Sequence, residues 1–242
     1  MSRVIVSGGN GRFSNVMKKF NSSHEIFFLS KEEMNICDLN SIEKSILRYN
    51  PDVFIHTAAL SRPMNLHDNF PEKSIELNII GTSNCVVSCI KHNIKFIYIS
   101  TDFVYPGETG NYKETDGVLP FNKYAWSKLG GECACMLYDN SLVLRMSMIE
   151  NPFPHKKAFS DSFRSNIWHE EAVEILYSLI ESDAKGIYNV GGEKKSVYDF
   201  VSADLNSIEK DTIKNYSEKI PKDISLNIDK LGKNIKVFNE HM

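Results

Sequence analysis

The sequence predicts an α/β fold in which helices cover both faces of one parallel sheet, a doubly wound arrangement. Three observations indicate this class. Short apolar segments typical of buried strands alternate along the chain with longer segments of helical pattern. The first apolar segment, Arg3–Ser7, runs directly into a glycine-rich turn. The chain has 242 residues, 42% of them hydrophobic, which is enough for one sizeable core with a small appendage.

The predicted strands and helices follow one another in regular order. Asn40 starts the second helix, and Pro51 lies just beyond its end. Helical connections leave the strands parallel, and such sheets bind ligands beyond the carboxyl ends of their strands. We expect strands near residues 3–7, 25–29, 53–58, 95–100, 142–147 and 186–190, and helices near 12–20, 40–49, 72–92, 122–138 and 169–181.

The turn after the first strand reads Gly8-Gly-Asn-Gly11-Arg-Phe-Ser14. Glycines there allow a tight turn and let the backbone approach a pyrophosphate, whose charge is met by free N–H groups at a helix N-terminus. The spacing differs from Gly-x-Gly-x-x-Gly, and a plain turn is the alternative. We interpret the turn as a dinucleotide-binding loop whose cofactor contacts are Gly8, Asn10, Gly11, Arg12, Phe13 and Ser14.

A second motif is Tyr124-Ala-Trp-Ser-Lys128. Residues four apart share one face of a helix, so Lys128 can bring its positive charge near the Tyr124 hydroxyl and favour the phenolate. A tyrosine whose pKa is lowered from its usual ~10 can exchange protons near neutrality. The alternative is an ordinary exposed helix pair. Thr101 follows the apolar run Phe96–Ile99, so its hydroxyl is expected at the rim of the sheet.

Six segments together resemble the extended short-chain dehydrogenase/reductases, in the same order along the chain. They resemble most of all the dTDP-4-dehydrorhamnose reductases, which carry a Ser-Thr-Asp segment and a Pro-Leu-Asn-x-Tyr-x-x-x-Lys-x-x-x-Glu segment. The resemblance covers about residues 3 to 200 and is thin beyond Leu144. The segments are Gly8 to Ser14, Asp38-Leu39, Ala58-Ala59, Asn78, Ser100-Thr-Asp-Phe-Val-Tyr105, and Pro120-Phe-Asn122-Lys-Tyr124-Ala-Trp-Ser-Lys128-Leu-Gly-Gly-Glu132.

The resemblance implies a Rossmann-like fold and a role for each matching residue. It implies that Tyr124 donates a proton to a substrate ketone, that Thr101 holds the ketone oxygen, and that Lys128 tunes Tyr124. Thr101 could instead simply cap the strand end. Asp102 and Phe103 are expected beside Thr101 and Tyr124 at the substrate. The cofactor side is expected to include Ala58, Ala59 and Asn78, as well as Tyr124 and Lys128, although Asn78 could also be a solvated helix residue.

Cofactor choice is predicted from the end of the second strand. NAD enzymes usually place a carboxylate there, whereas a nearby arginine accommodates the 2′-phosphate of NADP. This chain has Ser30 and Lys31 there, with Arg12 in the glycine loop. These residues favour NADPH, although Glu32 and Glu33 keep NADH possible. By the resemblance, Asp38 and Leu39 contact the adenine, while Asp38 could equally cap the following helix.

The predicted function is NADPH-dependent reduction of the 4-keto group of a nucleotide-activated deoxysugar. A nucleotide-sugar epimerase shares the same catalytic residues and is one alternative. The second alternative is a non-catalytic, NADP-binding regulatory subunit, suggested by a C-terminal region shorter than is typical of the family. The related dehydratases resemble this chain but carry Thr-Asp-Glu, whereas Phe103 follows Asp102 here. Dehydration is therefore disfavoured.

The predicted domain organisation has two parts. Residues 1–150 form the NAD(P)-binding domain, to which 168–191 return. Residues 151–167 and 192–242 form a small, shortened substrate-binding region, with Asn151–Lys157 as a loop whose cations suit a diphosphate or as a solvated linker. The long helices near 72–92 and 122–138 could pair across a two-fold axis, so a homodimer is expected.

Composition excludes several other classes. A net charge of −3 offers no basic excess for nucleic acid. No apolar run approaches the ~20 residues of a membrane span, so a cytoplasmic protein without a membrane partner is expected. The five cysteines are odd in number and lack paired metal-type spacing. Reduced thiols and no metal site are therefore predicted.

Overall fold

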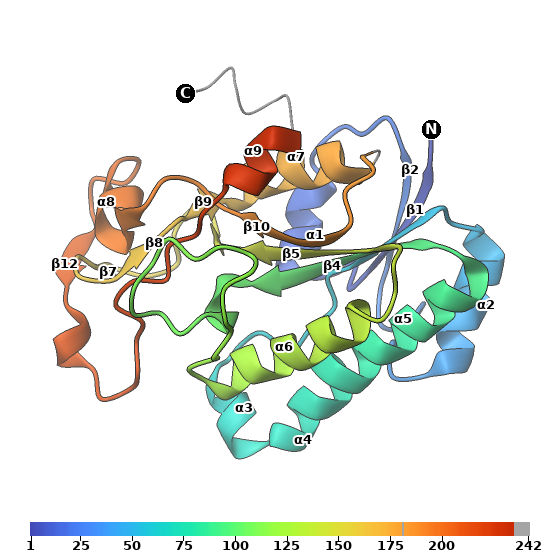
Figure 1. Cartoon of the computed structure of the whole chain (residues 1–242), viewed down its shortest axis with the longest axis horizontal. Helices are drawn as coiled ribbons and strands as arrows, with labels where there is room; N and C mark the ends of the chain where they lie inside the picture. Colours follow the sequence, from blue (N-terminus) through green and yellow to red (C-terminus); the bar gives the residue numbers. More distant parts are fainter. Residues whose placement is uncertain (181, 235–242) are drawn as a thin grey trace.

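The structure, a computed structural model, describes residues 1–180 and 182–234. Its centre is a six-stranded sheet in which every neighbouring pair is parallel (Figure 1). The predicted doubly wound parallel sheet is confirmed. In spatial order the strands are β2 (Glu25–Leu29), β1 (Arg3–Ser7), β3 (Val53–His56), β4 (Lys95–Thr101), β5 (Ser141–Met146) and β10 (Gly186–Val190).

The strands form where apolar runs can be buried on both faces. All residues of β3 and of β5 are buried, as a sheet covered on both sides requires. The chain moves from β1 outward to β2 and then crosses back to β3 on the other side of β1. Ser7 and His56 pair at the carboxyl ends of β1 and β3. The crevice beyond these two ends lies at a topological switch point, where open α/β sheets bind their ligands.

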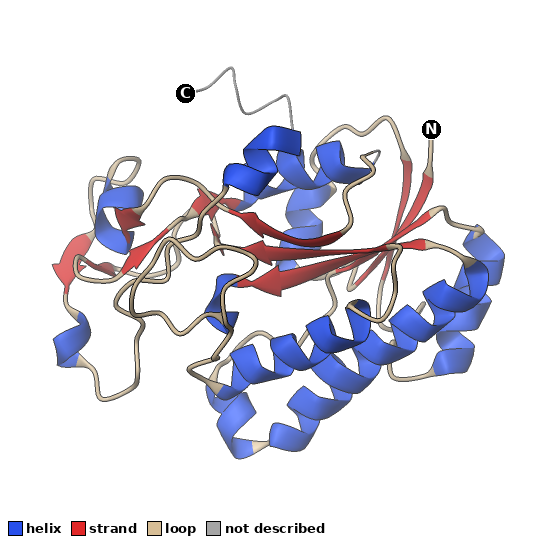
Figure 2. Cartoon of the chain, in the orientation of Figure 1, coloured by secondary structure: helices blue, strands red, loops and turns tan. Residues whose placement is uncertain are grey.

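Two layers of helices enclose the sheet (Figures 1 and 2). On one face lie α1 (Arg12–Met17), α7 (His169–Ile180) and α9 (Asp229–Asn234), and on the other lie α2 (Leu39–Tyr49), α5 (Gly81–His92) and α6 (Lys123–Cys135). Each layer buries its own apolar core against the sheet. Within the described residues, none of these helices combines the length and apolar character needed to cross a membrane.

The predicted helix over 72–92 is real but is not one regular α-helix. It begins as α4 (Pro71–Ser74), continues as the π-helical segment η1 (Ile75–Ile80), and ends as α5. A short helix, α3 (Asn65–Asn69), precedes it. Two other predicted helices are shorter than expected, since α1 ends at Met17 and α6 at Cys135. Residue 181, the predicted end of the helix that forms α7, lies outside the described residues.

A small region follows the sheet. It contains paired strands β7 (Lys157–Phe159) and β12 (Glu209–Asp211), paired strands β8 (Phe163–Arg164) and β11 (Lys195–Ser196), helix α8 (Val197–Ser202) and the 3-10 turn η3 (Ile213–Asn215). Strands β6 (Met148–Ile149) and β9 (Ile167–Trp168) pair where the chain leaves and re-enters the main domain. Ala158, Val197 and Val201 are the buried centre of this region.

The last described helix departs from the predicted domain boundary, which assigned all of 192–242 to the small region. Leu231 of α9 is buried in the core between the sheet and α7. The Lys230 ammonium donates to the Ile187 carbonyl on the edge strand β10 at 2.6 Å. The chain thus returns to the main domain at 229–234, because the apolar side chain of Leu231 packs into its core. Residues 235–242, which were also assigned to the small region, lie outside the described residues.

Candidate active site

A cavity of about 640 Å³ opens at the carboxyl edge of the sheet. Its walls come from the loops after β1, β2, β3 and β4, from α6, and from β8 of the small region. Most of the predicted site residues meet there although they are far apart in sequence. Those that line it are Gly8, Asn10, Gly11, Arg12, Phe13, Ser14, Lys31, Ala58, Ala59, Thr101, Phe103, Tyr124 and Lys128.

The glycine loop has the geometry that a close-approach loop needs. Gly8 has φ of +68°, and a Cβ there would lie 2.8 Å from the Cα of Ala58. Gly8 accepts a hydrogen bond from the Gly11 N–H at 2.8 Å, and Gly11 then caps α1. Any side chain at residue 8 would therefore separate the loop after β1 from the loop after β3. The first N–H groups of α1, beginning at Arg12, follow this turn.

Tyr124 is placed by the start of α6. The Asn122 side chain accepts a hydrogen bond from the Ala125 N–H at 2.8 Å and caps the helix. Burial, reinforced by the negative charge of Asp102, raises the pKa of Tyr124 to about 12. A hydrogen bond with Thr101 and the positive charges of Arg62 and Arg164 act in the opposite direction. Tyr124 is therefore a protonated phenol, ready to act as an acid.

Lys128 is one helical turn beyond Tyr124 and is buried, with 3% of its surface exposed. Its ammonium lies 4.0 Å from the centroid of the Tyr98 ring. Burial lowers the pKa of Lys128 to about 7. The expected lowering of the pKa of Tyr124 is not seen in this structure, because burial of the phenol raises it; burial of Lys128 also leaves that side chain only partly charged near pH 7.

The segment after β4 holds the predicted substrate contacts. The Thr101 Oγ accepts a hydrogen bond from the Phe103 N–H at 3.3 Å, starting the 3-10 turn η2 (Asp102–Val104). Thr101 thus caps the strand end and also lines the cavity. Asp102 is fully buried beneath the wall and does not line the cavity; it pairs with Arg164 instead. The Phe103 ring lies 6.3 Å from the Tyr124 ring.

Asn78 lies in η1 and is buried, so the idea of a solvated helix residue is wrong. Its amide accepts from the Leu60 N–H at 2.8 Å and donates to the Leu60 carbonyl at 2.9 Å and to the Ser127 hydroxyl at 2.8 Å. It does not line the cavity. Asn78 therefore ties the loop after β3 to α6 at the residue before Lys128.

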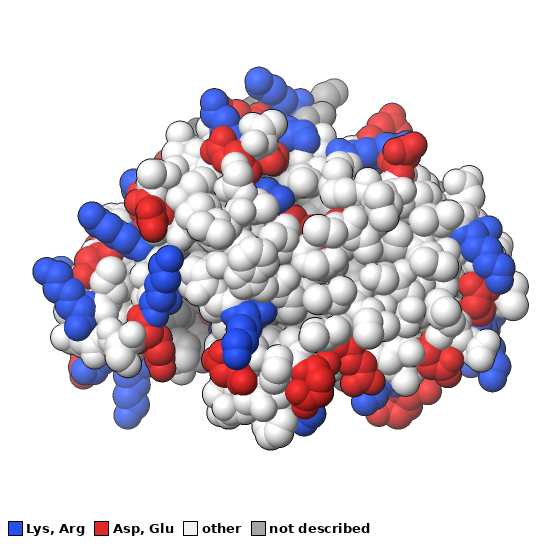
Figure 3. All heavy atoms as spheres, turned by 60° about the horizontal axis from the view of Figure 1, so that its bottom comes forward, with Lys and Arg blue, Asp and Glu red and all other residues white. Residues whose placement is uncertain are grey.

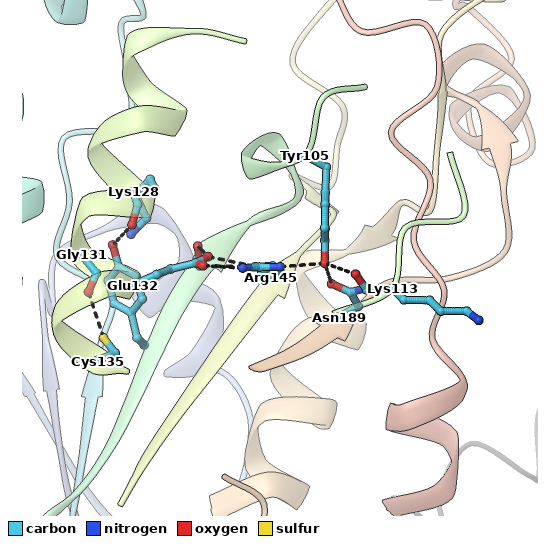
Figure 4. A network of polar contacts seen from close by, with 10 residues as sticks. Tyr105, Lys113, Lys128, Gly131, Glu132, Cys135, Arg145 and Asn189 are labelled. Atoms are coloured by element: carbon cyan, nitrogen blue, oxygen red, sulfur yellow. Dashed lines mark hydrogen bonds and ion pairs between the residues drawn. The ribbon is translucent and has the colours of Figure 1, made fainter. Parts of the chain in front are cut away.

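A buried polar network supports the other side of α6 (Figure 4). Glu132 accepts hydrogen bonds from Arg145, with a shortest contact of 2.8 Å, and another from Ser100. The Arg145 guanidinium also donates to the Tyr105 hydroxyl at 2.9 Å, which in turn donates to Asn189 at 2.8 Å. The network connects α6, β5 and β10 next to Thr101 and Lys128.

Besides Asn78, three predicted cofactor residues do not line the cavity. Asp38 caps α2 by accepting from the Asn40 N–H at 2.9 Å, and Leu39 is the first residue of that helix, 45% exposed. Ser30 forms reciprocal hydrogen bonds with Glu33 in the turn after β2. In their place, the cavity wall near α2 is formed by Met34, Asn35 and Ile36.

Arg12 lines the cavity, but its guanidinium is held by other residues of the chain. Its guanidinium donates to Glu150 at 2.7 Å and to Ser61 at 3.2 Å, so it points toward the loops after β3 and β6. Arg62 donates to the same Glu150 oxygen at 3.0 Å. Lys31, in the loop after β2, also lines the cavity.

Among the cavity residues that sequence reasoning missed, four have ionisable side chains: Arg62, Glu150, Arg164 and His169. Arg62 follows Ala58-Ala59 closely enough that the carboxyl-edge rule could have found it. Arg164 gave no signal, because its position depends on how the small region folds back. Residues 151–157, considered for diphosphate binding, do not line the cavity.

The fold and the assembled threonine, tyrosine and lysine define a class, the extended short-chain dehydrogenase/reductases. The sequence matches the family described as the RmlD substrate binding domain over residues 2–222. The chain belongs to this family, as the motif resemblance predicted.

Known relatives agree with this assignment. A dTDP-4-dehydrorhamnose reductase of Aggregatibacter actinomycetemcomitans is 28% identical over 152 residues, or 61% of this chain and 51% of that protein. A methionine adenosyltransferase 2 subunit beta of Bos taurus is 31% identical over 159 residues, or 61% of this chain and 47% of that protein. The matched segments thus span about half the length of these relatives.

Among solved structures, the dTDP-4-dehydrorhamnose reductase of Bacillus anthracis in complex with NADP superimposes with a TM-score of 0.85 at 20% identity. The superposition covers 95% of this chain and 92% of that one. This likeness confirms the fold.

Proposed function

We propose that the protein reduces the 4-keto group of a nucleotide-activated deoxysugar with NADPH. The observation that carries the proposal is the meeting of Thr101, Tyr124 and Lys128 in the cavity that the glycine loop also lines. Two of the similar proteins named above are dTDP-4-dehydrorhamnose reductases. We further propose that it acts in the cytoplasm.

The residues present fit a dinucleotide. Gly8 and Gly11 keep side chains out of the turn where a pyrophosphate would approach, and the first N–H groups of α1 supply donors there. Lys31 offers a positive charge for a 2′-phosphate, which favours NADPH over NADH. When bound, the cofactor supplies the hydride. Arg12 contributes to phosphate binding only after it leaves Glu150.

The chain's own residues supply a proton and hold the substrate. The Thr101 hydroxyl, at the cavity wall, donates a hydrogen bond to the ketone oxygen. Tyr124 transfers its phenolic proton to that oxygen as the carbonyl carbon accepts a hydride, and the product is a hydroxyl. Lys128, whose pKa of about 7 leaves it only partly charged near neutrality, becomes more fully protonated beside anionic groups, and its positive charge then stabilises the tyrosinate left behind.

Of two related reactions, dehydration fits the site less well, whereas epimerisation is separated from reduction only by its use of the cofactor. A dehydratase needs a free carboxylate at this position, whereas both Asp102 oxygens are bound by Arg164 and residue 103 is phenylalanine. An epimerase needs the same residues but regenerates its cofactor within one turnover. Turnover that consumes NADPH in proportion to substrate would exclude an epimerase.

The test is to mix the protein with NADPH and dTDP-4-dehydro-6-deoxy-L-mannose and to follow nicotinamide absorbance. We expect NADPH oxidation that Tyr124→Phe reduces by about 10² to 10⁴-fold. Tyr216→Phe, which alters an exposed tyrosine of the small region, is the control and should keep full activity. Undiminished turnover by Tyr124→Phe would refute the role of the phenol. Tighter binding of NADH than of NADPH, measured by nicotinamide fluorescence, would refute the cofactor choice.

A second candidate is a non-catalytic, NADP-binding regulatory subunit. It is favoured by the similarity to proteins named methionine adenosyltransferase 2 subunit beta. The assembled Thr101, Tyr124 and Lys128 argue against it, because a binding subunit has no chemical need for them. NADPH binding without reduction of any nucleotide-sugar ketone, together with co-elution with a methionine adenosyltransferase, would establish this alternative.

We also propose that the protein forms a homodimer through α5 and α6. The side of the molecule that carries these helices shows a broad area without charged residues (Figure 3). Exposed apolar side chains lie there: Val87, Ile90, Trp126, Met136 and Leu137. Light scattering after size-exclusion chromatography is expected to give a dimer that Val87→Glu converts to monomer; a monomeric wild type would refute it.

A further inference from the structure

Arg164 is the one residue of β8 that reaches the cavity from the small region, within the part of the chain that the structure describes. Two of the three nitrogens of its guanidinium bind the Asp102 carboxylate. The Nε donates to one carboxylate oxygen at 3.0 Å, and the Nη2 contacts both oxygens at 2.6 and 2.8 Å. Asp102 is fully buried, and the Arg164 side chain is 17% exposed. This pair links the small region to the end of β4.

The same guanidinium also covers the substrate wall. Its central carbon lies 4.6 Å from the centroid of the Phe103 ring, which itself packs beside Tyr124. Among the described residues, none forms a hydrogen bond with the Nη1 of Arg164. Since Arg164 lines the cavity, Nη1 can donate to an oxygen of a ligand there.

The charge of Asp102 matters for Tyr124. Asp102 is the main negative charge that raises the pKa of Tyr124, while Arg164 is one of the positive charges that lower it. Without Arg164, a buried carboxylate would face the phenol unbalanced, and loss of the phenolic proton would become still less favourable. The ion pair therefore contributes to the acidity of Tyr124, in addition to the larger effect of burial.

We propose that Arg164 is a positioning residue for the reduction: it neutralises Asp102 beside Tyr124, and its Nη1 donates a hydrogen bond to a hydroxyl oxygen of the sugar substrate. The inference rests on the proposed reductase function. It assigns to the small region a direct part in the chemistry. It also separates two effects, charge neutralisation and substrate binding, that can be measured apart.

The test compares Arg164→Met with the double variant Arg164→Met/Asp102→Asn, which lacks both charges. For Arg164→Met we expect kcat to fall by about tenfold or more, corresponding to about one unit or more in the pKa of Tyr124, and KM to rise. In the reverse reaction, oxidation of the alcohol by NADP⁺, the acid limb of the pH profile is expected to move to higher pH. The double variant should recover kcat and the wild-type pH profile, while KM stays raised because the Nη1 donor is still missing.

Lys195→Met is the matched control. Lys195 lies opposite Arg164 in the register of the antiparallel strands β8 and β11, but its side chain is exposed on the surface. This variant should leave kcat and KM unchanged. If Arg164→Met does not fold, the double variant alone decides the question, because it leaves no unpaired buried charge. A folded double variant, able to bind NADPH, whose kcat or pH profile stays far from wild type would overturn the charge role. A wild-type KM in that variant would overturn the substrate contact.

A failure of the inference is distinct from a failure of the proposed function. An active wild type with an unrecovered double variant refutes only the role of Arg164. A wild type that binds NADPH but reduces no nucleotide-sugar ketone refutes the reductase proposal, and the inference with it.

Discussion

Replacement of Lys128 by methionine is expected to stabilise the protein in a pH-dependent way. Lys128 titrates at 10.5 when unperturbed and at about 7 in the folded protein, because burial disfavours its charge. At pH values between these two pKa values, Lys128 holds a proton in the unfolded chain and has lost it in the folded protein. The free energy of unfolding of the wild type therefore falls as the pH is lowered. The shifted pKa of Lys128 therefore lowers the free energy of unfolding by about 2 kcal/mol at pH 9 and by about 4 to 5 kcal/mol at pH 6.

The measurement is urea unfolding of the wild type and of Lys128→Met at pH 9 and pH 6, without cofactor. The stability of the variant relative to the wild type should increase by roughly 2 to 3 kcal/mol between these values. Lys123→Met, at an exposed lysine on the same helix with 55% of its side chain accessible, is the control and should show no such increase. A difference between Lys128→Met and the wild type that is constant with pH would refute the reasoning.

Three further changes have defined outcomes. Glu132→Gln leaves the Arg145 guanidinium buried without its counter-charge, so urea unfolding should show a loss of about 3 to 5 kcal/mol; a loss below about 1 kcal/mol would contradict this. Gly8→Ala places a Cβ 2.8 Å from the Cα of Ala58, so the melting temperature and the NADPH affinity should both fall; unchanged NADPH fluorescence titration would argue against the loop as the cofactor site. Glu150→Gln removes a negative charge from the cavity wall, so NADPH should bind about fivefold more tightly at low salt, equivalent to about 1 kcal/mol, and the gain should shrink as salt is added.

Much of the sheet could be predicted because its strands are short apolar runs buried on both faces. The bounds of β1, β2 and β10 match the sequence prediction, and β3, β4 and β5 differ from it by at most two residues at an end. The segment 72–92 was less predictable. Its composition indicates one helix, but packing of η1 against α6 accommodates a π-helical segment that places Asn78 inward.

In the candidate site, too, some residues could be predicted from the sequence and others could not. The glycine turn, Thr101 and the spacing of Tyr124 and Lys128 are local patterns, and the structure brings these residues into one cavity. Asp38 and Leu39 could not be placed from sequence alone, because a side chain that caps a helix and one that contacts a cofactor look the same in a motif.

The sequence by itself determined the order of strands and helices, the turn after β1 and the face that Tyr124 and Lys128 share, because these depend on residues near one another in the chain. Tertiary structure alone decided the protonation of that pair, since desolvation depends on everything packed around it. It also decided the contact between Asp102 and Arg164, which are 62 residues apart. Their ion pair forms only because the small region folds back over the carboxyl end of β4.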